Sequence, residues 1–162
     1  MKSITTLHLM IGLPCSGKTT IAKQLEHTYS ALRLTPDEWH TRLFGHDVNE
    51  QEHVVRHNTI ESLLWDVATR VLELGVDVIL DFGFWVRSQR DEKRMKAAEL
   101  GVNCIIHFVY APEKVLLSRL QIRNATLPKG VAYIPESKLK DWYLLFEQPH
   151  TEELEYTKTY IL

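Results

Sequence analysis

Short apolar runs alternate along this chain with stretches in which apolar residues recur every three or four positions. The runs are rich in β-branched residues and predict strands, which lie at 4–11, 31–34, 76–81 and 102–110. The stretches between them predict amphipathic helices, which lie at 18–29, 49–75 and 90–100. This order indicates an α/β fold with a mostly parallel sheet, in which ligands bind at the carboxyl ends of the strands.

The segment 49–75 has the clearest helical pattern. Gly75 follows its last apolar residue, as is typical of the end of a helix. We expect one side of this helix to be buried, comprising Ile60, Leu63, Leu64, Val67, Val71 and Leu74.

The regular alternation ends after residue 110. Pro112 is typical of a helix start, and a polar stretch with Gly and Pro follows at 124–135. A helix is predicted at 136–147, and residues 157–162 have the pattern of a last strand. Because no repeat or linker interrupts the chain, we expect a single domain over 1–162.

Composition narrows the class of protein. A chain of 162 residues, 44% of them hydrophobic and 25% charged, can bury one sizeable core. The net charge of −2 provides no long-range attraction for a nucleic acid. Two cysteines are too few for a disulfide framework, and no apolar run is long enough for a membrane span or a signal peptide. We therefore expect a cytoplasmic protein with no membrane partner.

Residues 12–19, GLPCSGKT, fit the pattern G-x-x-x-x-G-K-[ST] between a predicted strand and a predicted helix. In such a loop the backbone N–H groups bind phosphate oxygens, Lys18 reaches the β- and γ-phosphates, and the Thr19 hydroxyl binds Mg²⁺. The Cys15 thiol is assigned no catalytic role. We expect ATP to be bound by Gly12, Pro14, Cys15, Ser16, Gly17, Lys18, Thr19 and Thr20.

Two acidic residues follow predicted strands at the same edge of the sheet. Asp81 ends the strand 76–81, where an acid can hold Mg²⁺ or its water, although a cap of the following turn is the alternative. Asp37 comes three residues after the strand 31–34 and can accept the proton of a hydroxyl group as a general base. Glu38 is the competing carboxylate, and an acid next to Pro36 would also suit a helix N-terminus.

Arg119 and Arg123 lie four residues apart, so they leave the same face if their segment is helical. Paired arginines suit a triphosphate, and residues 119–135 have the length and composition of a lid that excludes water from the reaction. A solvated basic face is the alternative interpretation.

Four histidines, at positions 40, 46, 53 and 57, raise the question of a metal site. His53 and His57 are one helical turn apart, but the sequence identifies no third ligand, so no zinc site is expected. His40 is close to Asp37 and is interpreted as a contact for substrate or phosphate.

Aromatic residues flank both acids: Trp39, Phe82, Phe84 and Trp85. Such residues usually belong to the core. On two strand-end loops they could also form an acceptor pocket, for which we select Phe84 and Trp85, or stack on a nucleic-acid base.

The stretches GLPCSGKTT, LTPDEWH, VILDFGFWVRSQRDEKR and RLQIRN…IPE resemble the small P-loop kinases that include polynucleotide 5′-hydroxyl kinases, chloramphenicol phosphotransferase and the zeta-toxin group. The resemblance extends from the first strand to about residue 147. It implies a three-layer fold with a roughly five-stranded sheet and a helical lid, Asp37 rather than Glu38 as the base, and Arg119 and Arg123 as the lid arginines. In the polynucleotide kinases an arginine lies three residues beyond the base, where this chain has His40.

These observations predict an ATP- and Mg²⁺-dependent kinase that phosphorylates a hydroxyl group of a small molecule, such as an antibiotic or a metabolite. In this hypothesis Lys18, Asp37, Arg119 and Arg123 are catalytic, and Thr19 and Asp81 support the metal. The alternatives are a polynucleotide 5′-hydroxyl kinase, a nucleotide-dependent ATPase or switch, and a binding module without catalysis.

Overall fold

The computed structural model describes residues 4–45, 49–127 and 133–162. Its strands form a five-stranded sheet in the order β2-β3-β1-β4-β5, and every adjacent pair is parallel. The strands are β1 (Thr6–Ile11), β2 (Leu32–Leu34), β3 (Val78–Gly83), β4 (Asn103–Tyr110) and β5 (Thr157–Ile161). The α/β fold predicted from the sequence is therefore confirmed, including the last strand.

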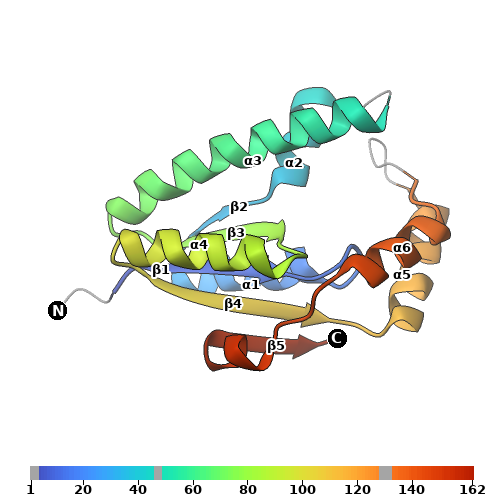
Figure 1. Cartoon of the computed structure of the whole chain (residues 1–162). Coiled ribbons are helices and arrows are strands. Elements are labelled where there is room, and N and C mark those ends of the chain that lie inside the picture. The colour runs from blue at the N-terminus through green and yellow to red at the C-terminus, as the bar shows by residue number, and fades with distance from the viewer. Residues whose placement is uncertain (1–3, 46–48, 128–132) are drawn as a thin grey trace.

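The helices lie on both faces of the sheet and at one end of it (Figure 1). They are α1 (Lys18–Tyr29), α2 (Pro36–Phe44), α3 (Glu50–Glu73), α4 (Arg87–Glu99), α5 (Glu113–Ala125) and α6 (Glu136–Leu145), with a 3₁₀-helix, η1 (Thr151–Tyr156). Helices α3 and α4 pack on one face and α1 on the other, while α5 and α6 stand together beyond the carboxyl end of β4. None of the helices in the described residues has the length and apolar content needed to cross a membrane.

Strand β1 is buried along its whole length, and β3 along most of it, because helices cover both faces of the sheet at its centre. In β1, Leu7, Leu9 and Ile11 pack toward α3 and α4, whereas Met10 packs toward α1. All four side chains are completely buried. This packing holds the carboxyl end of β1 in the middle of the sheet.

A chain of polar rings crosses the α1 face of the sheet. Nδ1 of His8 lies 2.9 Å from Nε2 of His107, and Nδ1 of His107 lies 2.9 Å from the hydroxyl group of Tyr160. Burial, together with the nearby His8 and Lys158, lowers the pKa of His107 to about 3. His107 is therefore neutral in the folded protein at neutral pH.

The buried side of α3 differs from the sequence prediction. The buried residues are Ile60, Leu64, Ala68 and Leu72, while Leu63, Val67 and Leu74 are exposed. The helix contacts the sheet along one narrow stripe of residues four apart, and within the described residues no second layer covers the flank that carries Leu63 and Val67. That part of the prediction is wrong because the pattern alone does not say how wide the covered stripe is.

The strand that was expected to end at Asp81 continues to Gly83. Asp81 therefore lies inside β3 and is buried, with 3% of its surface exposed. The alternative interpretation of Asp81 as a turn cap is excluded, because β3 continues past it and Gly83 still pairs with Ile11 of β1.

The predicted lid is described only in part. Residues 119–125 belong to α5, and residues 128–132 lie outside the described residues, as does His46. The side-chain amide of Asn124 donates to the carbonyl oxygen of Ile134 at 2.7 Å and accepts from its N–H group at 3.3 Å. These two hydrogen bonds connect the described residues before position 128 to those after position 132.

Candidate active site

The order of the strands reverses direction at β1. Strand β1 lies between β3 and β4, and the chain leaves it toward β2 on one side before crossing later to β4 on the other. In open α/β sheets, ligands bind at this reversal of strand order. The loop between β1 and α1 begins at this point of the sheet.

The loop between β1 and α1 has the backbone shape of an anion-binding nest. Cys15 and Gly17 have positive φ angles of 69° and 93°, and the amide of Gly12 donates to the carbonyl oxygen of Gly83 at 3.3 Å. Left-handed residues within such a turn direct successive N–H groups toward one point. Gly17 is followed at once by α1, whose N-terminus adds partial positive charge.

Gly12 is required because other atoms approach it closely. A Cβ atom at this position would lie 2.7 Å from the carbonyl oxygen of Val109 and 2.7 Å from Oγ of Ser16. The backbone oxygen of Val109 cannot move without shifting β4. The loop therefore packs directly against the neighbouring strand.

Asp81 joins three elements around this loop. Its Oδ1 lies 3.2 Å from Nζ of Lys18, and its Oδ2 accepts hydrogen bonds from the hydroxyl groups of Thr19 at 2.8 Å and Thr35 at 3.0 Å. Lys18 and Thr19 begin α1, whereas Thr35 immediately precedes α2. The structure thus brings Lys18, Thr19 and Asp81 together, as the sequence suggested, and adds Thr35, which the sequence analysis missed.

The oxygens of Thr19 and Asp81 suit a magnesium ion. Mg²⁺ prefers hard oxygen ligands and usually binds through one or two protein side chains, with water and phosphate completing its shell. When bound, the ion neutralises charge on the phosphates. Thr19 and Asp81 are the residues of this site that would hold it.

Arg119 and Arg123 both reach the phosphate loop from α5. Nη1 of Arg119 donates to the carbonyl oxygens of Cys15 and Ser16, each at 3.2 Å. Nη1 of Arg123 is buried without a hydrogen-bond partner among the described residues. Burial raises the pKa of the Cys15 thiol, although both guanidinium groups oppose this effect. The thiol is therefore protonated at neutral pH, and the positive charges are directed at the loop.

Pro14 and Thr20 lie on either side of Lys18 and Thr19 in the chain: Pro14 in the loop after β1, and Thr20 in α1. Pro14 is half-buried within the loop, and Thr20 is exposed in the first turn of α1. Pro14 has no N–H group to donate, so it contributes to the shape of the loop.

The two competing carboxylates at the start of α2 have different surroundings. The side chain of Glu38 accepts a hydrogen bond from Arg33 at 3.1 Å, and Lys23 lies 4.0 Å from it. The side chain of Asp37 is 83% exposed, with Nδ1 of His57 at 4.0 Å from its Oδ1. Asp37 is therefore the carboxylate that is open to an incoming molecule.

His40 is buried and packs against other imidazole rings. Its ring centroid lies 4.4 Å from that of His53 and 5.7 Å from that of His57. The hydrogen bond that His57 donates to Glu61 raises the pKa of His57; burial opposes this effect, and the charges of Glu61 and Asp37 add to it. The structure thus places His40 in a histidine cluster between α2 and α3.

The aromatic residues divide between two regions. Phe84 has a positive φ of 42°, is buried in the core beneath α3 and α4, and stacks on Phe82 with ring centroids 5.4 Å apart. Trp85 packs instead near the phosphate loop, against Trp142 at 5.6 Å. Trp39 is partly exposed on α2. Phe84 and Trp85, which the sequence analysis combined in one acceptor pocket, therefore belong to different clusters.

A hollow of about 370 Å³ opens between α3, the end of β3 and α4. Phe82 and Phe84 line it together with Glu61 and the polar residues Gln89 and Lys93. Its volume is in the range of small-molecule sites, and its lining combines aromatic and polar groups.

A buried ion pair supports the turn after β3. Arg90 donates to both carboxylate oxygens of Glu153, at 2.7 and 3.0 Å, and to the carbonyl oxygens of Phe84 at 3.1 Å and Glu147 at 3.0 Å. The side chains of Arg90 and Glu153 are completely buried. No pattern in the sequence indicates this pair, because only the folded chain brings together residues 63 positions apart.

A family model described as an AAA domain, AAA_33, matches residues 7–149 of this chain. The chain belongs to the AAA_33 family. AAA_33 is a P-loop kinase family, so the small P-loop kinase resemblance found in the sequence is confirmed. No curated protein matches the chain.

Several solved structures share the fold of this chain, although their sequence identity to it is low. A candidate kinase from Chloroflexus aurantiacus has a TM-score of 0.76 at 20% identity, with 98% of this chain and 89% of that chain covered. A gluconokinase from Sinorhizobium meliloti has a TM-score of 0.64 at 18% identity, covering 99% and 84%. A chain of the Pnkp1/Rnl/Hen1 RNA repair complex has a TM-score of 0.72 at 19% identity, covering 90% and 45%. These comparisons establish a P-loop kinase fold.

Proposed function

We propose that this protein is an ATP- and Mg²⁺-dependent kinase that transfers the γ-phosphate of ATP to a hydroxyl group of a small molecule. The observation that carries the proposal is the position of Asp37. Thr35, two residues earlier, is bonded to Asp81 of the phosphate site, so the start of α2 is held beside that site while the Asp37 carboxylate stays exposed.

In this proposal each charged group has one task. The N–H groups of the loop and Lys18 bind the β- and γ-phosphates, while Arg119 and Arg123 stabilise the negative charge of the transferred group. Asp37 accepts the proton of the attacking hydroxyl group. Phosphoryl transfer requires little covalent chemistry from the protein, so positioning and electrostatics supply most of the catalysis.

Two observations favour a small acceptor. The hollow beside Phe84 has the volume and mixed lining of a small-molecule site, and the chain carries a net charge of −2. The likeness to a gluconokinase is consistent with this proposal. Both cysteines are free thiols, which fits the reducing, cytoplasmic compartment expected from the sequence.

A polynucleotide 5′-hydroxyl kinase is the second candidate. The likeness to a chain of an RNA repair complex and the partly exposed Trp39, on which a base could stack, favour it. His40 counts against it, because it replaces an arginine expected from the resemblance and is buried among other histidines.

The test is a phosphate-transfer screen with γ-labelled ATP and Mg²⁺. The acceptors are sugars and sugar acids, aminoglycoside and phenicol antibiotics, nucleosides and 5′-hydroxyl oligonucleotides, with one reaction that lacks an acceptor. A labelled small molecule supports the proposal. A labelled oligonucleotide alone supports the second candidate, labelled free phosphate alone identifies an ATPase, and intact bound ATP identifies a binding module.

Two lysine substitutions in α1 provide a test variant and its matched control. Lys18→Met removes the cation at the phosphates and should abolish labelling. Lys23→Met removes a lysine that is 57% exposed on the same helix and should leave labelling unchanged. Label that persists with Lys18→Met would come from a contaminating kinase.

A further inference from the structure

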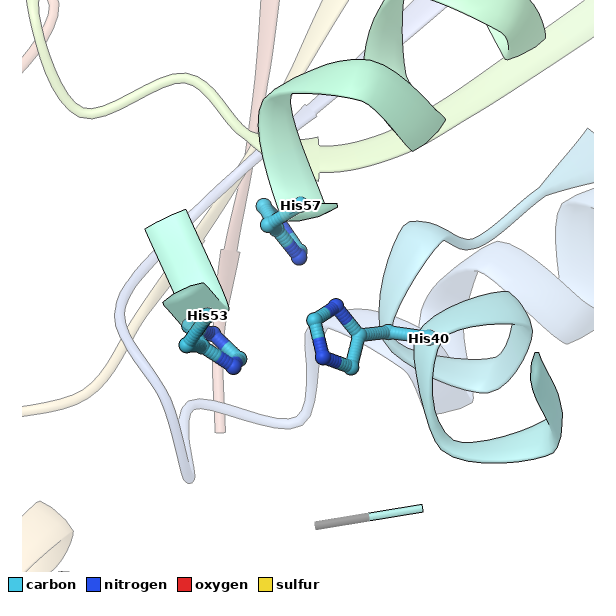
Figure 2. A group of neighbouring side chains, drawn as sticks. All are labelled: His40, His53 and His57. Atoms are coloured by element: carbon cyan, nitrogen blue, oxygen red, sulfur yellow. The ribbon is translucent and has the colours of Figure 1, made fainter. Parts of the chain in front are cut away.

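Three histidines from two helices come together beside Asp37. His40 lies in α2, and His53 and His57 lie one turn apart in α3. Figure 2 shows their imidazole rings pointing toward one another, and one ring nitrogen from each lies within 4.8 Å of the other two. The structure thus supplies His40 as the third imidazole, which could not be identified from the sequence.

The arrangement is close to that of a transition-metal site. Three imidazoles with metal–nitrogen bonds of about 2.0–2.1 Å in a tetrahedral site place their nitrogens about 3.3 Å apart. The cluster therefore has to contract by about 1.5 Å at most. His40 is buried and fixed by packing, whereas His53 is exposed and can make this adjustment.

The surroundings of His57 prepare one of its nitrogens for a metal. Nε2 lies 3.4 Å from Oε1 of Glu61, while Nδ1 has no hydrogen-bond partner within the described part of the chain. A carboxylate that holds the far nitrogen of a metal-binding histidine is a common feature of zinc sites. Oδ1 of Asp37 lies 4.0 Å from Nδ1, and a water molecule is available as the fourth ligand, so the Asp37 carboxylate stays free to act as the proposed base.

We propose that His40, His53 and His57 bind one divalent transition-metal ion, with Zn²⁺ as the best match, and that this ion joins α2 to α3. Imidazole nitrogen suits Zn²⁺ and its neighbours in the first transition row, whereas Mg²⁺ prefers oxygen. The site is separate from the Mg²⁺ position at Thr19 and Asp81. Because α2 begins at Pro36 and carries Asp37, the ion would also fix the position of this carboxylate.

The test measures metal binding without nucleotide or acceptor, so its result does not depend on the proposed kinase activity. Tag-free protein is treated with a chelator and then titrated with Co²⁺ in excess Mg²⁺, which occupies oxygen sites. We expect one Co²⁺ per chain, with the visible absorption of a tetrahedral nitrogen-ligated ion, and displacement by one equivalent of Zn²⁺. Zn²⁺ at about one hundred times its dissociation constant should raise the melting temperature by roughly 5–10 °C.

Three variants locate the site. His53→Ala removes an exposed ligand and should weaken Co²⁺ binding at least 10-fold, while Glu61→Gln should weaken it roughly 10–100-fold through His57. His27→Ala, which removes an exposed histidine of α1, should bind like the original protein. Circular dichroism without metal verifies that each variant is folded. Equal binding by His53→Ala and the original protein, or a spectrum of purely octahedral Co²⁺, would overturn the proposal.

Discussion

The phosphate loop and the start of α2 face the same proposed reaction but are built differently. At the loop, the buried carboxylate of Asp81 holds Lys18, Thr19 and Thr35 at 2.8–3.2 Å. At α2, the Asp37 side chain is 83% exposed and has an imidazole nitrogen 4.0 Å away. We call the first region the donor side and the second the acceptor side.

The difference follows from what each side has to do. Groups that stabilise charge on a phosphate are strongest when they are fixed in a dry environment before the ligand arrives. A carboxylate that must stay ionised until its substrate binds is better kept in water, where its charge is not penalised. Substitutions on the donor side should therefore change stability or nucleotide binding, and those on the acceptor side should change rate alone.

The largest expected effect is on the acceptor side. Asp37→Asn should lower phosphate transfer roughly 10²–10⁴-fold, because the variant cannot take up the hydroxyl proton. The affinity for ATP and the midpoint of urea unfolding should not change, because the side chain is exposed. Steady-state kinetics with the acceptor from the screen and calorimetry with ATP measure the two properties.

Glu38→Gln is the matched control, since Glu38 is the neighbouring carboxylate and already pairs with Arg33. It should retain transfer within a few-fold of the original rate. A larger loss in Glu38→Gln than in Asp37→Asn would transfer the role of base to Glu38.

The next largest effect is expected on the free energy of unfolding, at the buried ion pair of Arg90 and Glu153. Glu153→Gln leaves the buried Arg90 guanidinium without its counter-charge, and we expect a loss of about 3–5 kcal/mol in the free energy of unfolding. Glu152→Gln, which breaks the exposed contact to Arg87, should change unfolding little. Urea denaturation measures both, and equal stabilities would contradict the assignment of Arg90 and Glu153 as structural support.

A smaller effect is expected at Asp81. Asp81→Asn replaces an acceptor oxygen with an amide that cannot accept from all three donors, and should weaken Mg²⁺–ATP binding roughly 10–100-fold. Binding of ATP in the presence of EDTA should fall less. Asp77→Asn, just before β3 at the opposite edge of the sheet, is the control. An equal loss with and without Mg²⁺ would exclude Asp81 as a metal-supporting residue.

The smallest expected effect is a dependence of the free energy of unfolding on pH, which arises from His107 in β4. The pKa of His107 is about 3 in the folded protein, against an ordinary value of 6.5, so below pH 6.5 only the unfolded chain takes up the proton. The stability contributed by neutral His107 is present above pH 6.5 and is lost as pH falls toward 3. From pH 7 to pH 5 this costs about 2 kcal/mol.

The neighbours His8, Asp77, Lys158 and Tyr160 affect the same ring network, so the measurement compares variants. In His107→Gln, the free energy of unfolding by urea should change less between pH 5 and pH 7 than in the original protein. In His27→Gln, which changes an exposed histidine, this pH dependence should stay the same. The same slope in His107→Gln and the original protein would exclude His107 as its source.

Prediction from sequence succeeded where the decisive interactions are local. Helix α1 was predicted at 18–29 and lies at Lys18–Tyr29, because the loop glycine and the apolar spacing act within a few residues. It failed on Leu63 and Leu74, since their exposure depends on which flank of α3 another layer covers. Asp81 was found as a site candidate, but its burial inside β3 depends on pairing with β1.

The sequence by itself determined the nest of the phosphate loop, its lysine and the parallel α/β order. These features depend on backbone turns and apolar runs that are contiguous in the chain. Only the tertiary structure decided that Thr35 completes the Asp81 network, that Arg90 meets Glu153 and that His40 joins His53 and His57. Side chains that are distant in sequence converge only after the helices pack on the sheet, and no local pattern of residues encodes that contact.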